Sequence, residues 1–228
     1  MTPRPGSNAT LMRGVYLLTP DADVSSFADV LRVLTIALEE GVTVVQYRNK
    51  MAGNESRPRE ARQLVKLAQA AGALAIINDD VDLAAAVGAD GVHLGREDGD
   101  AATARKRLSD RLLGVSCYDD LARASRAVDA GADAIAFGSI FASTSKPAAT
   151  TAPIAVLSAA RERFADRRVL AIGGIDATNI ARVAAAGAHA AAVIAAVFSA
   201  PEPRAAIRAL IEQFSIGTQL YESQRAAV

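Results

Sequence analysis

The sequence predicts a single-domain α/β protein of the (β/α)8, or TIM, barrel type. Eight short apolar runs alternate with helix-like stretches, which is the pattern of βαβ units and therefore of a parallel sheet. A short phrase with a central Gly recurs before several of these runs. The length of 228 residues is close to the roughly 250 residues of a barrel that forms one domain. Together these observations favour a closed barrel over an open sheet.

The recurring phrase marks the points at which helices are expected to end and strands to begin. Gly suits the position just past a helix because it adopts the left-handed conformation without a Cβ clash. The phrase occupies residues 39–42, 70–73, 86–89, 129–132 and 185–188. The expected strands are residues 15–19, 42–47, 74–77, 91–94, 112–116, 134–137, 169–172 and 190–194.

The stretches between these strands are predicted to form the helices of an outer ring. Two of them, residues 121–130 and 180–186, are rich in Ala. Ser56, Asp119 and Asp176 stand before helix-like stretches, and their side chains are of the kind that accepts a hydrogen bond from the first free N–H groups of a helix. We therefore expect these three residues to be N-caps.

Composition and charge limit the partners and the compartment. The 25 basic and 25 acidic residues cancel, so the net charge does not point to nucleic acid or an anionic membrane as the main partner. We expect small-molecule substrates, and the sequence leaves open a homo-oligomer. A single cysteine, Cys117, and a first segment without an apolar run favour a cytoplasmic protein. The barrel is expected over residues 13–215, between a flexible tail at 1–12 and a C-terminal tail at 216–228.

Basic side chains follow the second predicted strand. The two-residue period of a strand places Gln46, Arg48 and, if the strand continues, Lys50 on one face at the barrel mouth. Chemistry in TIM barrels lies where strands end. Arg can form two hydrogen bonds to phosphate oxygens at once, and Lys acts as a point charge, so the pattern suits a diphosphate. The alternative is a solvated loop that happens to be basic.

Acidic residues follow the third and fourth predicted strands. Asp79 and Asp98 are expected to approach a shared cation, because neighbouring strands lie about 4.8 Å apart. Mg²⁺ is commonly held by one or two carboxylates together with substrate phosphate and water. Asp80 opens a helix and is better explained as a cap, and His93 lies inside a strand as a hydrogen-bonded core residue.

The remaining strand ends add hydroxyl groups and small residues. The fifth strand ends near Ser116, and the sixth leads into a Ser/Thr-rich loop that closes on Lys146. The seventh and eighth end at 173–174 and 194–195, where Gly and Ala leave backbone N–H groups open to a phosphate. The sequence thus predicts two anion sites that face each other across one mouth.

The motifs at 46–50, 77–84, 91–98 and 171–175 closely resemble the thiamine phosphate synthase family, over about residues 15–198. The resemblance implies a transferase that joins a hydroxymethylpyrimidine diphosphate to a thiazole phosphate and releases pyrophosphate. It implies that the pyrimidine diphosphate is bound by Gln46, Tyr47, Arg48, Asn49, Lys50, Asn78, Ser116 and Lys146. It places the thiazole phosphate on Ser143, Thr144, Ser145, Gly174, Ile194 and Ala195. It assigns Mg²⁺ to Asp79 and Asp98, and catalysis to Arg48, Lys50, Ser116 and Lys146.

Some positions depart from the family pattern. Ala142 stands where Pro is usual, Ala155 replaces the Gly of a Gly-Leu pair, Ala195 replaces a common Ser, and Tyr118 a frequent His. Two other functions are compatible with the barrel. A thiazole tautomerase-like paralogue would need neither diphosphate nor Mg²⁺ site, and a non-catalytic barrel could bind a thiamine precursor. Neither explains the basic and acidic strand ends together.

Overall fold

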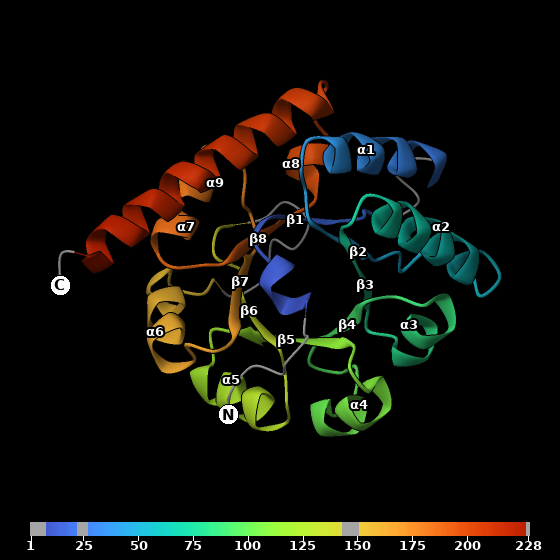
Figure 1. Ribbon diagram of the computed structural model, residues 1–228, viewed down its shortest axis with the longest axis horizontal. Coiled ribbons are helices and arrows are strands. Elements are labelled where there is room, and N and C mark those ends of the chain that lie inside the picture. The colour runs from blue at the N-terminus through green and yellow to red at the C-terminus, as the bar shows by residue number, and fades with distance from the viewer. Residues whose placement is uncertain (1–7, 22–26, 143–150, 227–228) are drawn as a thin grey trace.

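The structure is a computed structural model that describes residues 8–21, 27–142 and 151–226. In these residues, eight parallel strands pair in chain order and close into a barrel, with β8 against β1 (Figure 1). The strands are β1 Gly14–Leu18, β2 Val44–Tyr47, β3 Leu74–Asn78, β4 Gly91–Leu94, β5 Leu112–Tyr118, β6 Ala134–Phe137, β7 Arg168–Ile172 and β8 Ala190–Val193. The predicted fold class is confirmed, and each predicted strand overlaps an observed one.

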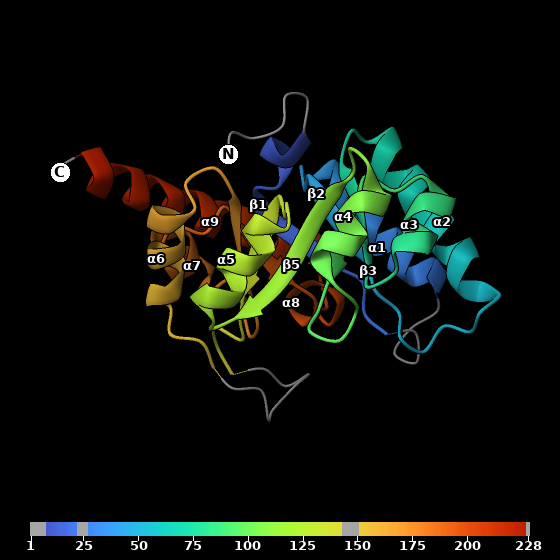
Figure 2. The same ribbon diagram turned by 90° about the horizontal axis from the view of Figure 1, so that it is seen from below.

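The helices α1 to α9 surround the barrel on its outside, whereas η1 lies over one end of it (Figure 1). They are η1 Asn8–Leu11, α1 Phe27–Glu39, α2 Ser56–Ala70, α3 Val81–Val87, α4 Ala101–Leu108, α5 Leu121–Asp129, α6 Ala155–Arg163, α7 Ile180–Ala185, α8 Ala195–Phe198 and α9 Pro203–Ala226. The short helix η1 lies at the end of the barrel opposite to the one at which β5 terminates (Figure 2). None of the helices in the described ranges is long and apolar enough to cross a membrane.

The core has two layers because successive strand residues point to opposite faces. On β1, Tyr16 and Leu18 belong to the cluster inside the barrel, whereas Val15 and Leu17 belong to the cluster between strands and helices. The interior cluster combines a large side chain, Tyr16, with small ones such as Ala136. Polar interior side chains occur toward the carboxyl ends of the strands, and this end is where the site lies.

The predicted helix caps are only partly confirmed. Asp80 caps α3, and its carboxylate accepts a hydrogen bond at 2.8 Å from the N–H three residues on. The cap of α5 is Asp120 rather than Asp119, because Asp120 accepts the equivalent bond at 2.9 Å. The prediction of Ser56 as a cap is wrong, because Ser56 is the first residue of α2 and its hydroxyl donates to the Gly53 carbonyl instead of accepting a hydrogen bond from the helix. Asp176 is not the cap of α7, which is Asn179. The Asp176 carboxylate instead accepts a hydrogen bond from the Thr178 N–H in the turn before the helix.

The expected tails at both ends contain ordered elements. Residues 8–11 form η1, and Met12 is buried at 1% exposure in the interior cluster. The division expected at 215–216 falls inside α9, which continues to Ala226. A Cβ at Gly217 would collide with the carbonyl oxygen of Ala181, so α9 packs closely on α7 beyond this division.

Candidate functional site

Interior polar residues form the floor of the barrel mouth. The buried Gln46 side chain from β2 accepts a hydrogen bond from the Tyr16 hydroxyl at 2.7 Å, and its Nε2 donates to Asn78 Oδ1 at 2.7 Å. Burial raises the pKa of Tyr16, so its hydroxyl stays protonated and donates. This series of hydrogen bonds fixes the amide orientations of Gln46 and Asn78, and it leaves the Nδ2 donors of Asn78 for a substrate.

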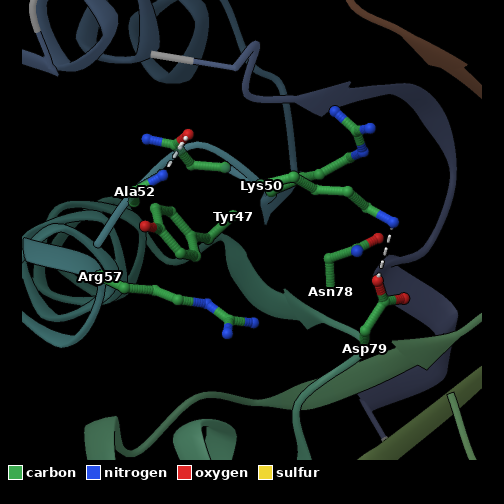
Figure 3. Close-up of a pocket in the computed structure, with 8 residues that line it drawn as sticks. Tyr47, Lys50, Ala52, Arg57, Asn78 and Asp79 are labelled. Carbon is green, nitrogen blue, oxygen red and sulfur yellow. Dashed lines mark hydrogen bonds and ion pairs between the residues drawn. The ribbon is translucent and has the colours of Figure 1, made fainter. Parts of the chain in front are cut away.

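The two cations after β2 are held beside a pocket of about 280 Å³ (Figure 3). Arg48 Nη1 lies 3.0 Å from Asp21 Oδ2, and the Lys50 backbone N–H donates to Asp21 Oδ1 at 2.8 Å. Lys50 Nζ lies 3.5 Å from Asp79 Oδ2. Burial raises the pKa of Asp21, but the bonds from Lys50 and Arg48 outweigh it and hold that pKa below its ordinary value. The prediction that both cations reach the mouth is thus matched by their placement.

The acids after β3 and β4 come together. The Asp79 and Asp98 side chains are close enough for their charges to interact, and Asp98 Oδ2 accepts a hydrogen bond from the Gly95 N–H at 2.9 Å. Burial, and next the Asp98 carboxylate, raise the pKa of Asp79 to about 6, although Lys50 opposes the shift. Two carboxylates that crowd in this way suit a hard divalent cation. In the described ranges no group of three or more potential metal ligands occurs, so substrate oxygens or water would complete a coordination shell.

Ser116 on β5 is positioned from β4. Its Oγ lies 2.9 Å from His93 Nε2. Burial lowers the pKa of His93 to about 4, against a smaller opposite effect of Asp98, so the ring is neutral. A Cβ at Gly114 would collide with this ring, and Gly is therefore required there. His93 is hydrogen-bonded, as the sequence indicated, but its exposure is intermediate and it belongs to neither core cluster.

The other residues of the motif at 46–50, Tyr47 and Asn49, line the same pocket and direct their polar groups toward Glu60 on α2 (Figure 3). The Tyr47 hydroxyl donates to Glu60 Oε2 at 2.8 Å, and Asn49 Nδ2 donates to the same oxygen at 3.0 Å. Sequence reasoning missed Glu60, which looks like one more charge of a surface helix. It also missed Arg57, which lines the pocket and lies 3.6 Å from Asp80 (Figure 3).

The opposite side of the mouth is formed by the loops after β7 and β8. Gly174 has a φ of 61°, and a Cβ there would collide with the Ala142 carbonyl oxygen after β6. Ile194 and Ala195 form the junction of β8 with α8. These three residues of the predicted thiazole phosphate site therefore lie at the strand-end face. Its other members, Ser143, Thr144 and Ser145, and also Lys146, lie outside the described residues.

A closed barrel whose strand ends join basic, amide and paired carboxylate groups defines the class of (β/α)8 enzymes that bind phosphorylated small molecules. Within this class, the chain belongs to the thiamine monophosphate synthase family, whose model matches residues 15–197. The resemblance inferred from the motifs is thereby confirmed.

Individual relatives agree with this membership. A thiamine-phosphate synthase of Halorhodospira halophila is 50% identical over 204 residues, which cover 89% of this chain and 95% of the relative. One of Chromobacterium violaceum is 46% identical, over 89% of this chain and 97% of the relative. The solved thiamine phosphate pyrophosphorylase of Pyrococcus furiosus superposes with a TM-score of 0.82 at 31% identity, over 92% of this chain and 99% of that one.

Proposed function

We propose that the chain is a thiamine phosphate synthase, which joins a hydroxymethylpyrimidine diphosphate to a thiazole phosphate and releases pyrophosphate. Family membership supports this function. The observation that carries it is the convergence of Arg48, Lys50 and the Asp79–Asp98 pair on one strand-end site, since a tautomerase or a simple binding barrel needs no such combination.

In this proposal, the diphosphate lies against the β2 and β3 strand ends. Arg48 and Lys50 bind its oxygens, and Asn78 donates through Nδ2, which the Gln46 contact leaves available. Mg²⁺ bound by Asp79 and Asp98 would supply further positive charge to the leaving group. Lys146 would add a cation from the opposite loop, as the family resemblance implies. Ser116, held by His93, would orient the pyrimidine diphosphate.

The reaction then needs no nucleophilic side chain. The bond between the pyrimidine methylene and the diphosphate oxygen breaks, and its electron pair leaves with pyrophosphate. The thiazole nitrogen donates its lone pair to the resulting pyrimidine cation. Gly174, Ile194, Ala195 and the hydroxyls of residues 143–145 would hold the thiazole phosphate for this attack. The protein acts by positioning and by stabilising the charge of the leaving group.

The tautomerase alternative relies on a His at the end of β5, where this chain has Cys117 and Tyr118 as the last two residues of the strand. Cys117 is buried, and burial raises the pKa of its thiol to about 12. Tyr118 stacks beneath the Arg96 guanidinium, whose carbon lies 4.3 Å from the ring centre. The buried lone thiol also supports the proposed cytoplasmic location.

The decisive assay supplies both substrates with Mg²⁺ and follows thiamine phosphate and pyrophosphate. We expect equal amounts of the two products, and none from either substrate alone. Isomerisation of a thiazole carboxylate phosphate without joining would support the tautomerase instead. Binding of either substrate without turnover would support the non-catalytic barrel that binds a thiamine precursor.

The order of bond breaking has its own test. A trifluoromethyl group on the pyrimidine destabilises the cation and should slow single turnovers severely while binding is retained. Equal rates for both pyrimidines, with chemistry rate-limiting, would favour direct displacement by the thiazole nitrogen.

A further inference from the structure

We propose that Glu60 is a positioning residue, which holds the loop 48–52 in the conformation that binds the diphosphate. This inference rests on the proposed function of Arg48 and Lys50. Glu60 lies on α2, outside the barrel, and it does not line the pocket. Its effect on the substrate would therefore be transmitted through the loop.

Glu60 is held where a charge is expensive to bury. The residue is 7% exposed, and its Oε2 accepts hydrogen bonds from the Tyr47 hydroxyl and from Asn49 Nδ2. The Tyr47 ring is itself buried and packs edge-on against Phe27, with ring centres 6.1 Å apart. A buried carboxylate is tolerated only where such donors satisfy it, so the network has a defined geometry.

Asn49 passes this geometry to the loop. While its Nδ2 is bound to Glu60, its Oδ1 accepts hydrogen bonds from the backbone N–H groups of Met51 and Ala52, each at 3.2 Å. The Asn49 side chain thus fixes the turn of the backbone just after Lys50. Arg48 and Lys50 are the immediate neighbours of Asn49, so loss of its anchor would loosen both cations.

The loop has a second anchor on its other side. The Asp21 carboxylate binds the Arg48 guanidinium and the Lys50 backbone N–H. This contact engages one of the cations that the diphosphate itself would bind, whereas the Glu60 contact does not. Thr19 Oγ1 also holds the Arg48 backbone, because it accepts from the Arg48 N–H at 2.8 Å and donates to the Arg48 carbonyl at 2.7 Å. Thr19 and Asp21 thus fix the loop up to Lys50, and Glu60, through Asn49, fixes the turn that follows.

The test compares Glu60→Ala with Glu60→Gln, whose amide oxygen retains an acceptor for both donors. We expect Glu60→Ala to raise the KM for the pyrimidine diphosphate by about tenfold, with the KM for the thiazole phosphate unchanged. Glu60→Gln should restore the KM close to that of the wild type. Asn49→Ala should reproduce the Glu60→Ala defect, and the double variant should show no further loss.

Calorimetry with inorganic pyrophosphate and Mg²⁺ provides a readout that does not depend on turnover. The affinity for pyrophosphate should fall in Glu60→Ala by the same factor by which the KM for the pyrimidine diphosphate rises. Gly217→Ala serves as the control, because it strains the contact of α9 with α7 far from the mouth and should leave pyrophosphate affinity unchanged.

Three outcomes would overturn the role of Glu60. They are unchanged pyrophosphate affinity in Glu60→Ala, a Glu60→Gln variant as defective as Glu60→Ala, and additive losses in the double variant. A wild-type protein that binds pyrophosphate without making thiamine phosphate would instead reject the proposed function. The comparison of Glu60 variants by calorimetry would still hold in that case.

Discussion

Replacing Asp79 by Asn should stabilise the metal-free protein at neutral pH, although it removes a proposed metal ligand. The pKa of Asp79 is raised from 3.8 to about 6, first by burial and then by Asp98. The difference of about two pKa units corresponds to at most about 3 kcal/mol in the free energy of unfolding. Asn carries no charge to bury, and it also tolerates the φ of 67° at this position.

The sign of the pH dependence follows from the raised pKa. Below pH 3.8 the carboxyl is protonated in both states, and its contribution to stability is fully present. Between this pH and about pH 6 the unfolded chain loses the proton first, so the free energy of unfolding falls as pH rises. The gain of Asp79→Asn over the wild type should therefore grow across this window and then stay constant.

Urea unfolding in EDTA between pH 4 and 8, followed by circular dichroism, measures this gain. Asp110→Asn is the matched control for the loss of a carboxylate, because Asp110 is exposed in the turn before β5. Added Mg²⁺ should stabilise the wild type and not Asp79→Asn. A gain that does not vary with pH would refute the carboxylate coupling, and equal stabilisation of both proteins by Mg²⁺ would refute the metal site.

Three further outcomes are expected. The native protein should resist alkylation of Cys117 at pH 8 and react only after unfolding, because the thiol is buried and its pKa is raised to about 12; mass spectrometry after iodoacetamide checks this. Tyr118→Phe should keep synthase turnover within about tenfold, or about 1.4 kcal/mol, since the ring that stacks on Arg96 remains; a loss of several thousandfold would revive the tautomerase. Gly217→Ala should lower the melting temperature, because the collision with Ala181, at about 1–3 kcal/mol, exceeds the gain of about 1 kcal/mol in helix propensity.

The barrel could be predicted from the sequence because its signals are local. Each strand is an apolar run, and Gly residues such as Gly88, with a φ of 71°, end the helices before them. Helix caps are less well determined where two acids are adjacent, as at Asp119 and Asp120, since either could supply the oxygen. Which of the two caps the helix depends on the residue at which the helical backbone begins, and α5 begins at Leu121.

The site could be predicted where strand alternation applies and not where side chains from distant segments meet. Gln46 and Lys50 reach the mouth as their spacing requires. The anchors Asp21 and Glu60 approach the loop through tertiary contacts, from the end of β1 and from α2. No periodicity in the sequence relates these residues, so their roles emerge only from the folded structure.

The closed floor of the barrel has a consequence for the traffic of ligands. Met12, which follows η1, is buried in the interior cluster, and side chains such as Tyr16 and Ile76 fill the interior below the mouth. In the part of the chain that the structure describes, both substrates must therefore enter, and both products must leave, through the barrel mouth at the carboxyl ends of the strands. Pyrophosphate that remains bound after the reaction occupies the site that the next pyrimidine diphosphate needs. The turnover rate in a cell would then depend on how quickly other enzymes hydrolyse pyrophosphate.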